Sequence, residues 1–332
     1  MIVNHREPQG GETFPHSALL PGTDEELVST LTAELRRSGD TYDEVLLVVS
    51  DRTRDLLSDA VHDLTGVLRR AGRAGFYQRL GFAYERFRQY LAEQASRGRR
   101  VYVIAEPDLR ERPGDEPPPG RVRAYLAYES VCNDTYAPYG SAVTCVWDSR
   151  QHSAGVLDGV RATHRYLLTP QGRHRSPDFQ PADDYLSDHG RAALHAVPAA
   201  VDHEQTLTEF TGLRELRAAL SGWAVRHGFA ADPADDLVVA VTEVATNGLR
   251  HAATPVRVRA WHHGRTLITQ CDDNAGQPVP VTAGYHRPGG NRAVPGGRGL
   301  WLARQLADAV LLDTVPGRTS VRLHFPYHVM HR

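Results

Sequence analysis

Short, unbroken apolar runs alternate with longer amphipathic stretches in the first half of the chain, and this alternation most constrains its fold. The runs are EVLLVVS (44–50), RRVYVIAEP (99–107) and SAVTCVWD (141–148). Runs of this length that are rich in β-branched residues are typical of strands buried on both faces of a sheet. Because helical periodicity separates them, the pattern predicts an α/β domain with a doubly wound, mostly parallel sheet.

The stretches around these strands have the spacing of amphipathic helices. Helices are expected over 25–39, from Asp51 onward, over about 82–97, over 124–136 and over 153–166. Thr23 or Asp24 stands where the first helix needs an N-cap, and Gly39 follows its last periodic residue. The composition of residues 110–120, RERPGDEPPPG, predicts a loop.

The second half of the chain shows a different order of elements. The expected elements are helices over about 211–227 and 233–251, strands over 256–261 and 266–271, a helix over 299–309 and strands over 310–314 and 319–325. This order predicts an α/β sandwich with helices on one face of a mixed sheet. We therefore expect a tail over 1–13, a first domain over 14–180, a linker over 181–203 and a second domain over 204–328.

The overall composition narrows the classes of function. A formal net charge of -2 gives no basic field for nucleic acid, and we expect the basic stretches at 69–73 and 97–100 to be solvated helix ends. The three cysteines show neither a disulfide framework nor zinc-knuckle spacing. No basic-then-apolar leader and no apolar run of about 20 residues is present, so we expect a cytoplasmic protein without membrane spans.

The segment TEVATNGLRHA (242–252) carries the first candidate site residues. Glu243 and Asn247 are four positions apart on an expected helix, so both side chains project from one face. An asparagine amide oxygen can ligate Mg²⁺, and a glutamate can accept the proton of an attacking hydroxyl. The same spacing is also common on solvated helix faces, so the pair indicates a functional site only in combination with other segments of the sequence.

Two further segments supply groups suited to a nucleotide. In QCDDNAG (270–276), Asp272 follows a strand and could hydrogen-bond an adenine amino group beside a glycine turn. In PGGNRAVPGGRGLW (288–301), glycines that open a helix let backbone N–H groups approach phosphates, and Arg292 and Arg298 could add full charges. No lysine occurs in the chain, so arginine is the only basic side chain available for this purpose. Each segment alone is also compatible with an ordinary turn or a flexible connector.

The order and spacing of the three segments resemble the N-box and the two glycine boxes of the Bergerat (GHKL) ATPase fold. More narrowly, TEVATNGLRHA and GGRGLWLARQLADAVLL are similar to anti-sigma-factor serine kinases of the sigma-B regulator type. The resemblance covers about 204–328 and implies ATP and Mg²⁺ as cofactors. It implies Asn247 as the Mg²⁺ ligand, Glu243 as the base and Asp272 as the adenine contact, with glycine-box positions at Gly276, Gly297 and Gly299.

The resemblance also implies a function and its partners. An anti-sigma factor of this type binds a sigma factor, phosphorylates a STAS-type antagonist on Ser or Thr, and regulates transcription in a stress response; its relatives dimerise through the ATPase domain. In the first glycine box, Asn274 replaces the first glycine. This replacement keeps open an alternative function, a ligand-sensing switch that binds a partner protein without kinase activity. His203 in VDHEQTL lies only 44 residues before Asn247, too close to leave room for the phosphoacceptor hairpin of a histidine kinase.

The first half resembles the MEDS sensory domain, through HSALLPGTDEELVSTL (16–31), EVLLVVS, YESVCNDTYAPYGSAVTCVWD (128–148) and LDGVRATH (157–164). The resemblance implies a RecA-like fold, although the chain has no G-x-x-x-x-G-K-[ST] loop. It suggests a pocket for an unidentified small-molecule signal near the carboxyl ends of the strands, where Ser50, Asp51 and Asp148 lie. The candidate pocket residues are His16, Tyr128, Glu129, Asn133, Cys145, Asp148 and His164.

Overall fold

The computed structural model describes residues 14–38, 41–58, 68–71, 79–107, 109, 119–190, 194–252, 255–274, 279–288 and 298–326. The chain divides into two compact units, the first made of 1–73, 88–107 and 132–179 and the second of 74–87, 108–131 and 180–332. Helices α4 (Leu80–Ser96) and α5 (Pro119–Thr135) contribute residues to both units. The expected tail over 1–13 and the stop at Gly39 lie outside the described residues. Across the described ranges, no helix is long and apolar enough to span a bilayer.

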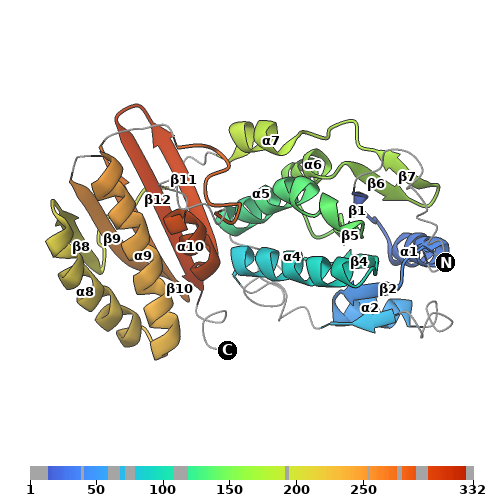
Figure 1. Cartoon of the computed structure of the whole chain (residues 1–332), viewed down its shortest axis with the longest axis horizontal. Coiled ribbons are helices and arrows are strands. Elements are labelled where there is room, and N and C mark those ends of the chain that lie inside the picture. Colours follow the sequence, from blue (N-terminus) through green and yellow to red (C-terminus); the bar gives the residue numbers. More distant parts are fainter. Residues whose placement is uncertain are drawn as a thin grey trace, which may run out of the picture. The chain divides into compact units, whose positions relative to one another are not determined.

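The first unit contains a seven-stranded sheet of order β3-β2-β4-β5-β1-β6-β7 (Figure 1). The strands are β1 (His16–Leu19), β2 (Glu44–Val48), β3 (Leu68–Arg70), β4 (Val101–Ala105), β5 (Ala142–Val146), β6 (Tyr166–Thr169) and β7 (Gly172–Arg175). All neighbours pair in parallel except β6 and β7, which form an antiparallel hairpin. The predicted mostly parallel sheet is confirmed.

Helices α1 (Asp24–Ser38), α2 (Asp51–Leu57) and α6 (Ala154–Thr163) connect these strands. Every residue of β2 and β5 is buried, as their continuous apolar sequences predict. One face of the sheet packs on α1 through a core that includes Leu31 and Leu35. Helix α2 begins where expected, because the Ser50 side chain accepts a hydrogen bond from the backbone N–H of Thr53 at 3.1 Å.

Several short elements were not expected from the sequence. They are β1, β3, the β6–β7 hairpin, α7 (Ala182–His189) and β8 (His203–Leu207). The sequences of β1 (HSAL) and β8 (HEQTL) contain polar residues that hide the strand pattern. Strand β1 is nevertheless fully buried between β5 and β6, so its partners, rather than its own propensity, fix its conformation.

The second unit contains a five-stranded sheet of order β11-β12-β10-β9-β8. Its strands after β8 are β9 (Val256–His263), β10 (Thr266–Asp273), β11 (Ala309–Val315) and β12 (Arg318–Pro326). All four pairings are antiparallel, so the predicted mixed sheet is wrong. Tight turns at Gly264 and Gly317, both with positive φ, make β9–β10 and β11–β12 hairpins, and β10 and β12 then pair antiparallel.

Helices α8 (Leu213–Arg226), α9 (Ala231–Ala252) and α10 (Arg298–Leu306) cover one face of this sheet (Figure 1), as predicted. The core between them contains Trp223 and Val241 from the helices and Leu267, Cys271 and Leu323 from the strands. Because successive strand residues alternate between faces, residues 268, 270 and 272 of β10 point to the face opposite the helices.

Candidate functional site

The acid–amide pair of α9 lies as its spacing predicts, on one side of the helix. Val241, Val244 and Ala245 are buried and hold the helix against the sheet. Glu243 and Asn247 are half-buried, so they are positioned by the core yet remain accessible. This arrangement suits two polar groups that act on a bound ligand, because the rigid helix fixes their relative position.

The start of α10 meets the same pair of side chains. Gly299 is buried in the first turn of α10, and a β-carbon built on it would lie 2.8 Å from Asn247 Nδ2 and 2.8 Å from Glu243 Oε2. Any larger residue at this position would force the ends of the Asn247 and Glu243 side chains to move, so glycine lets the backbone of α10 approach the pair as they stand. The partial positive charge of a helix N-terminus therefore stands directly beside a carboxylate and an amide, with exposed Arg298 as the first residue of the helix.

Asp272 does not join this group. Its side chain is on the opposite face of the sheet, where it accepts hydrogen bonds from Gln270 Nε2 at 2.7 Å, Ser320 Oγ at 2.5 Å and an Arg259 guanidinium nitrogen at 2.6 Å. These groups border a cavity of about 570 Å³ on that face, which Arg257 also lines. The structure thus separates Asp272 from Glu243 and Asn247 by the thickness of the sheet.

Asp273, the next residue, was not singled out from the sequence. Asp273 pairs with Thr319 of β12, two positions along from the pair of Cys271 and Val321. Because Cys271 packs against the helices and side chains alternate between faces, Asp273 lies on the face of the sheet that the helices cover. The sequence did contain a signal for this assignment: Leu267 and Cys271 are apolar, and Asp273 continues their two-residue alternation.

Three nucleotide-site residues predicted from the sequence, and the histidine that was rejected as a phosphoacceptor, remain to be placed. Gly276, Arg292 and Gly297 lie outside the described residues. His203 is the first residue of β8 and pairs with Ala260 of β9, so it stands in an edge strand and not on a helix.

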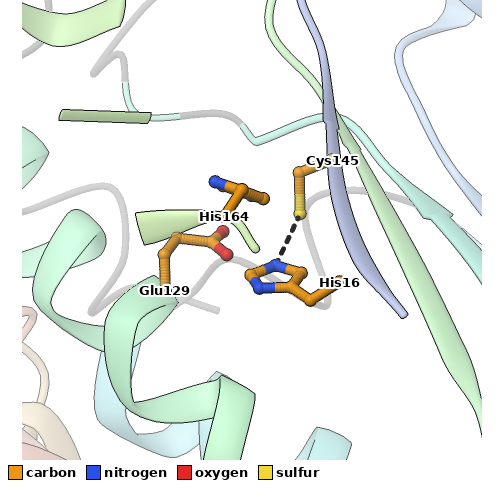
Figure 2. A group of neighbouring side chains, drawn as sticks. All are labelled: His16, Glu129, Cys145 and His164. Carbon is orange, nitrogen blue, oxygen red and sulfur yellow. Dashed lines mark hydrogen bonds between the residues drawn. The ribbon is translucent and has the colours of Figure 1, made fainter. Parts of the chain in front are cut away.

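Four of the proposed pocket residues converge. Suitable ligand atoms of His16, Glu129, Cys145 and His164 all lie within 4.8 Å of one another, and Figure 2 shows the side chains pointing toward one another. His16 comes from β1, Cys145 from the adjacent β5, His164 from the end of α6 and Glu129 from α5. Asn133, four residues after Glu129 on α5, hydrogen-bonds His16.

Asp148 and Tyr128 lie elsewhere. Asp148 accepts hydrogen bonds from Arg150 at 2.7 and 2.8 Å and from Gln151 at 3.0 Å. Burial acts to raise the pKa of Asp148, but these hydrogen bonds outweigh it and hold that pKa below its ordinary value. Tyr128 packs in the second unit against Tyr84 and Tyr285, with ring centroids 5.2 and 5.1 Å apart. Both residues are therefore part of local packing or ion pairing.

Comparisons with known proteins agree with the two-part architecture. Residues 15–165 match the MEDS family (MEthanogen/methylotroph, DcmR Sensory domain), and residues 208–325 match the histidine kinase-like ATPase domain. A solved structure of the RsbU and RsbW domains of Rv1364c from Mycobacterium tuberculosis is similar at 18% identity and a TM-score of 0.28. That match covers 37% of this chain and 32% of the other, so this chain spans about a third of its length. A search of curated proteins gave no significant match. The chain thus combines a MEDS-like sensory segment with a histidine kinase-like ATPase segment of the GHKL type.

Proposed function

We propose that the second unit binds Mg·ATP and phosphorylates a partner protein on Ser or Thr, and that the chain acts as an anti-sigma factor under the control of its sensory segment. The observation that supports this proposal is the close approach of the α10 backbone to Glu243 and Asn247, because a β-carbon added at Gly299 would meet both side chains. It joins a proton acceptor, a Mg²⁺ ligand and a helix N-terminus in one place, the groups that phosphoryl transfer requires.

Each group has a separate role in the proposed reaction. Asn247 would hold Mg²⁺ through its amide oxygen, and Mg²⁺ would neutralise charge on the phosphates when bound. The backbone N–H groups at the start of α10, with Arg298, would hold phosphate oxygens. Glu243 would accept the proton of the attacking hydroxyl and hold it on a carboxylate oxygen.

Asp273 is the better candidate for the adenine contact. It continues the face of β10 that the helices cover, whereas the carboxylate oxygens of Asp272 already accept three hydrogen bonds on the other face. An adenine amino group is a donor and needs a carboxylate or carbonyl acceptor. We therefore move this role by one residue, from Asp272 to Asp273.

Two points favour the hydroxyl group of a partner protein as the acceptor of the phosphoryl group. The motifs around Glu243 and Gly299 resemble the anti-sigma serine kinases, and His203 stands in an edge strand, where it has no helical phosphoacceptor hairpin around it. A sigma factor and a STAS-type antagonist are the partners that this resemblance implies.

A second candidate function is a sensor-controlled switch that binds a partner without phosphorylating it. One observation favours this switch: Asp272, the adenine contact implied by the resemblance, accepts hydrogen bonds from Arg259, Gln270 and Ser320 on the face of the sheet opposite the helices. If Asp273 does not replace it, adenine loses its acceptor and nucleotide affinity falls.

A phosphotransfer assay distinguishes the two functions. The full chain is incubated with Mg·ATP labelled in the γ-phosphate and with a panel of purified STAS-domain proteins, while sigma-factor binding is measured in parallel. We expect one antagonist to be labelled, and Glu243→Gln to reduce labelling by about 10²–10⁴-fold with sigma-factor binding retained. Glu215→Gln, on the exposed side of α8, is the matched control. Sigma-factor binding without labelling of any antagonist by the wild type would support the binding-only switch.

A further inference from the structure

We propose that His16, Glu129, Cys145 and His164 form a binding site for a divalent transition-metal ion of the Zn²⁺ class in the sensory segment. Two imidazoles, one thiolate and one carboxylate are a donor set that Zn²⁺ accepts in tetrahedral sites. The residues lie far apart in sequence, on β1, α5, β5 and the end of α6 (Figure 2). The convergence of these four side chains and the orientation of their donor atoms support a metal-binding site.

The central sheet places two of the donors side by side. Strands β1 and β5 are parallel neighbours in which Ala18 pairs with Cys145, and His16 is two residues before Ala18 on the same face. As a result, the Cys145 sulfur lies 3.7 Å from His16 Nε2. Figure 2 shows this contact as a dashed line, with the Glu129 carboxylate next to the same ring.

The tautomer of His16 follows from Asn133. The Asn133 Nδ2 group donates to the backbone carbonyl of Thr163 at 2.8 Å, which fixes the orientation of the amide. Its Oδ1 therefore faces His16 Nδ1 at 3.2 Å and accepts a hydrogen bond, so the proton of the neutral ring is on Nδ1. The lone pair of His16 is left on Nε2, the nitrogen that faces Cys145.

His164 is oriented in the same way. Its Nδ1 lies 2.8 Å from the backbone carbonyl of Val160, an acceptor that requires the ring proton on Nδ1. Its lone pair is therefore also on Nε2. Histidines that bind metals commonly donate the other ring N–H to a carbonyl or a similar acceptor, which orients the ring and fixes its tautomer. Both imidazoles of the group satisfy this condition.

Helix α5 carries both the carboxylate and the orienting amide. Glu129 and Asn133 are four residues apart, so they lie on one face of a continuous helix. Cys132, on the same turn, has its sulfur 3.5 Å from His16 Nδ1 and is the second thiol near this ring. The rigid helix therefore fixes the donor Glu129 relative to the group that orients His16.

Burial and charge favour a metal ion over solvent. The exposed fractions are 0% for His16, 6% for Glu129, 2% for Cys145 and 0% for His164. A thiolate and a carboxylate together carry two negative charges, which a divalent cation neutralises within a medium of low dielectric constant. Donor atoms bound at roughly 2.1 Å in a tetrahedron lie roughly 3.4 Å apart, so no pair of donor atoms would have to approach by more than roughly 1.4 Å.

A thiol nucleophile is the competing interpretation. Cys145, His16 and Asn133 follow one another in the order of a cysteine, its base and the group that orients the base. A nucleophile has to reach a substrate, however, whereas Cys145 and His16 are buried. This interpretation also gives no role to Glu129 and His164, which converge on the same point.

The proposal is tested on the full chain, purified under reducing conditions, stripped of metal and titrated with Co²⁺ and then Zn²⁺. We expect one equivalent of Co²⁺ per chain, intense visible d–d bands of tetrahedral geometry, and a near-ultraviolet thiolate-to-cobalt charge-transfer band that Zn²⁺ displaces. Cys145→Ser should abolish the charge-transfer band, and His164→Gln should weaken binding by at least about 100-fold. Cys271→Ala, which removes a buried thiol of the second unit, should change neither result.

Other outcomes would overturn the assignment. The metal site is wrong if the wild type binds no stoichiometric Co²⁺, a result that does not depend on the folding of any variant. The ligand set is wrong if Cys132→Ser, and not Cys145→Ser, removes the charge-transfer band. If Cys145 is alkylated rapidly by iodoacetamide and Zn²⁺ gives no protection, the nucleophile interpretation replaces the metal site. Circular dichroism of each variant shows that the chain remains folded.

Discussion

Asn133 connects His16 to the end of α6, because its Oδ1 lies 3.2 Å from His16 Nδ1 while its Nδ2 donates to the Thr163 carbonyl at 2.8 Å. One amide thus fixes the tautomer of a buried histidine and ties it to the backbone next to His164. This relation makes Asn133 a positioning residue for the proposed metal site, since it contacts a ligand rather than the ion.

Replacing Asn133 by alanine is expected to lower the affinity for Co²⁺ and Zn²⁺ by about 10–100-fold, the usual effect of removing a partner that orients a metal ligand. The charge-transfer band of Co²⁺ should persist at saturating metal, because Cys145 is unchanged. Asn133→Asp should restore much of the affinity, since a carboxylate also accepts the Nδ1 proton of His16. Loss of the charge-transfer band in Asn133→Ala would instead identify a wider collapse of the cluster.

The two neighbouring acids of β10 should differ in their effects on nucleotide affinity. Asp273→Asn is expected to weaken ATP binding at least about tenfold, because it replaces the proposed acceptor of the adenine amino group. Asp272→Asn should leave ATP affinity within about threefold but destabilise the fold by about 1.5–3 kcal/mol, since it weakens a charge-assisted bond to Arg259. Calorimetry and urea denaturation measure the two quantities, and the reverse pattern would return the adenine role to Asp272.

Gly299 is predicted to be essential for the nucleotide site. A methyl group there would meet Asn247 and Glu243 at 2.8 Å, so Gly299→Ala should displace both side chains and reduce Mg·ATP affinity by at least about tenfold. Gly155→Ala is the matched control, because Gly155 is also in the first turn of a helix but has open space around it. That variant should keep its affinity and gain up to about 1 kcal/mol in stability. Equal affinity in both variants would contradict the proposed geometry.

The stability of the second unit should depend on pH through His324 of β12. Burial lowers the pKa of His324 to about 4, with nearby Arg322 as a further cause. The unfolded chain binds a proton near pH 6.5, so this contribution to stability is complete above that pH and is lost as the pH falls toward 4. We expect the free energy of unfolding to decrease by about 3 kcal/mol over this window.

The variant His324→Gln should lose most of this pH dependence in urea denaturation at pH 7 and pH 4.5. His286→Gln, which changes an exposed histidine of the same unit, should keep the wild-type dependence. A wild-type chain whose stability does not change across this window would show that His324 is not held neutral in the folded state.

Most of the fold could be predicted from hydrophobic patterning, because the long elements have strong patterns. Strands β2, β4 and β5 are continuous apolar runs, and α9 has one apolar face. Strand β1 could not be found in this way, since HSAL has no such pattern and its conformation is set by two neighbouring strands. The prediction of a mixed second sheet was wrong, because the direction of each strand depends on pairings between distant segments that local sequence does not encode.

The candidate sites show the same limit. Spacing placed Glu243 and Asn247 on one helix face. The glycine motif singled out Gly299 for an approach to phosphates, whereas its approach to the Glu243 and Asn247 side chains was found only in the structure. The face of Asp272 depends on the register of β10 with β12, which the sequence motif alone does not specify. In the sensory segment, sequence resemblance proposed seven pocket residues, including Tyr128 and Asp148. Only three-dimensional packing separates these two from the four residues that converge, which are His16, Glu129, Cys145 and His164.

The most direct test of the account measures Mg·ATP binding to the full chain by calorimetry, with and without Mg²⁺, for the wild type and Asn247→Ala. We expect the wild type to bind ATP more tightly in Mg²⁺ than in EDTA. Asn247→Ala should lose this difference, with at least about tenfold weaker binding in Mg²⁺ and unchanged binding in EDTA. Equal affinities of the two proteins in Mg²⁺, or no binding by the wild type, would contradict the proposal that Glu243, Asn247 and the start of α10 form a nucleotide site.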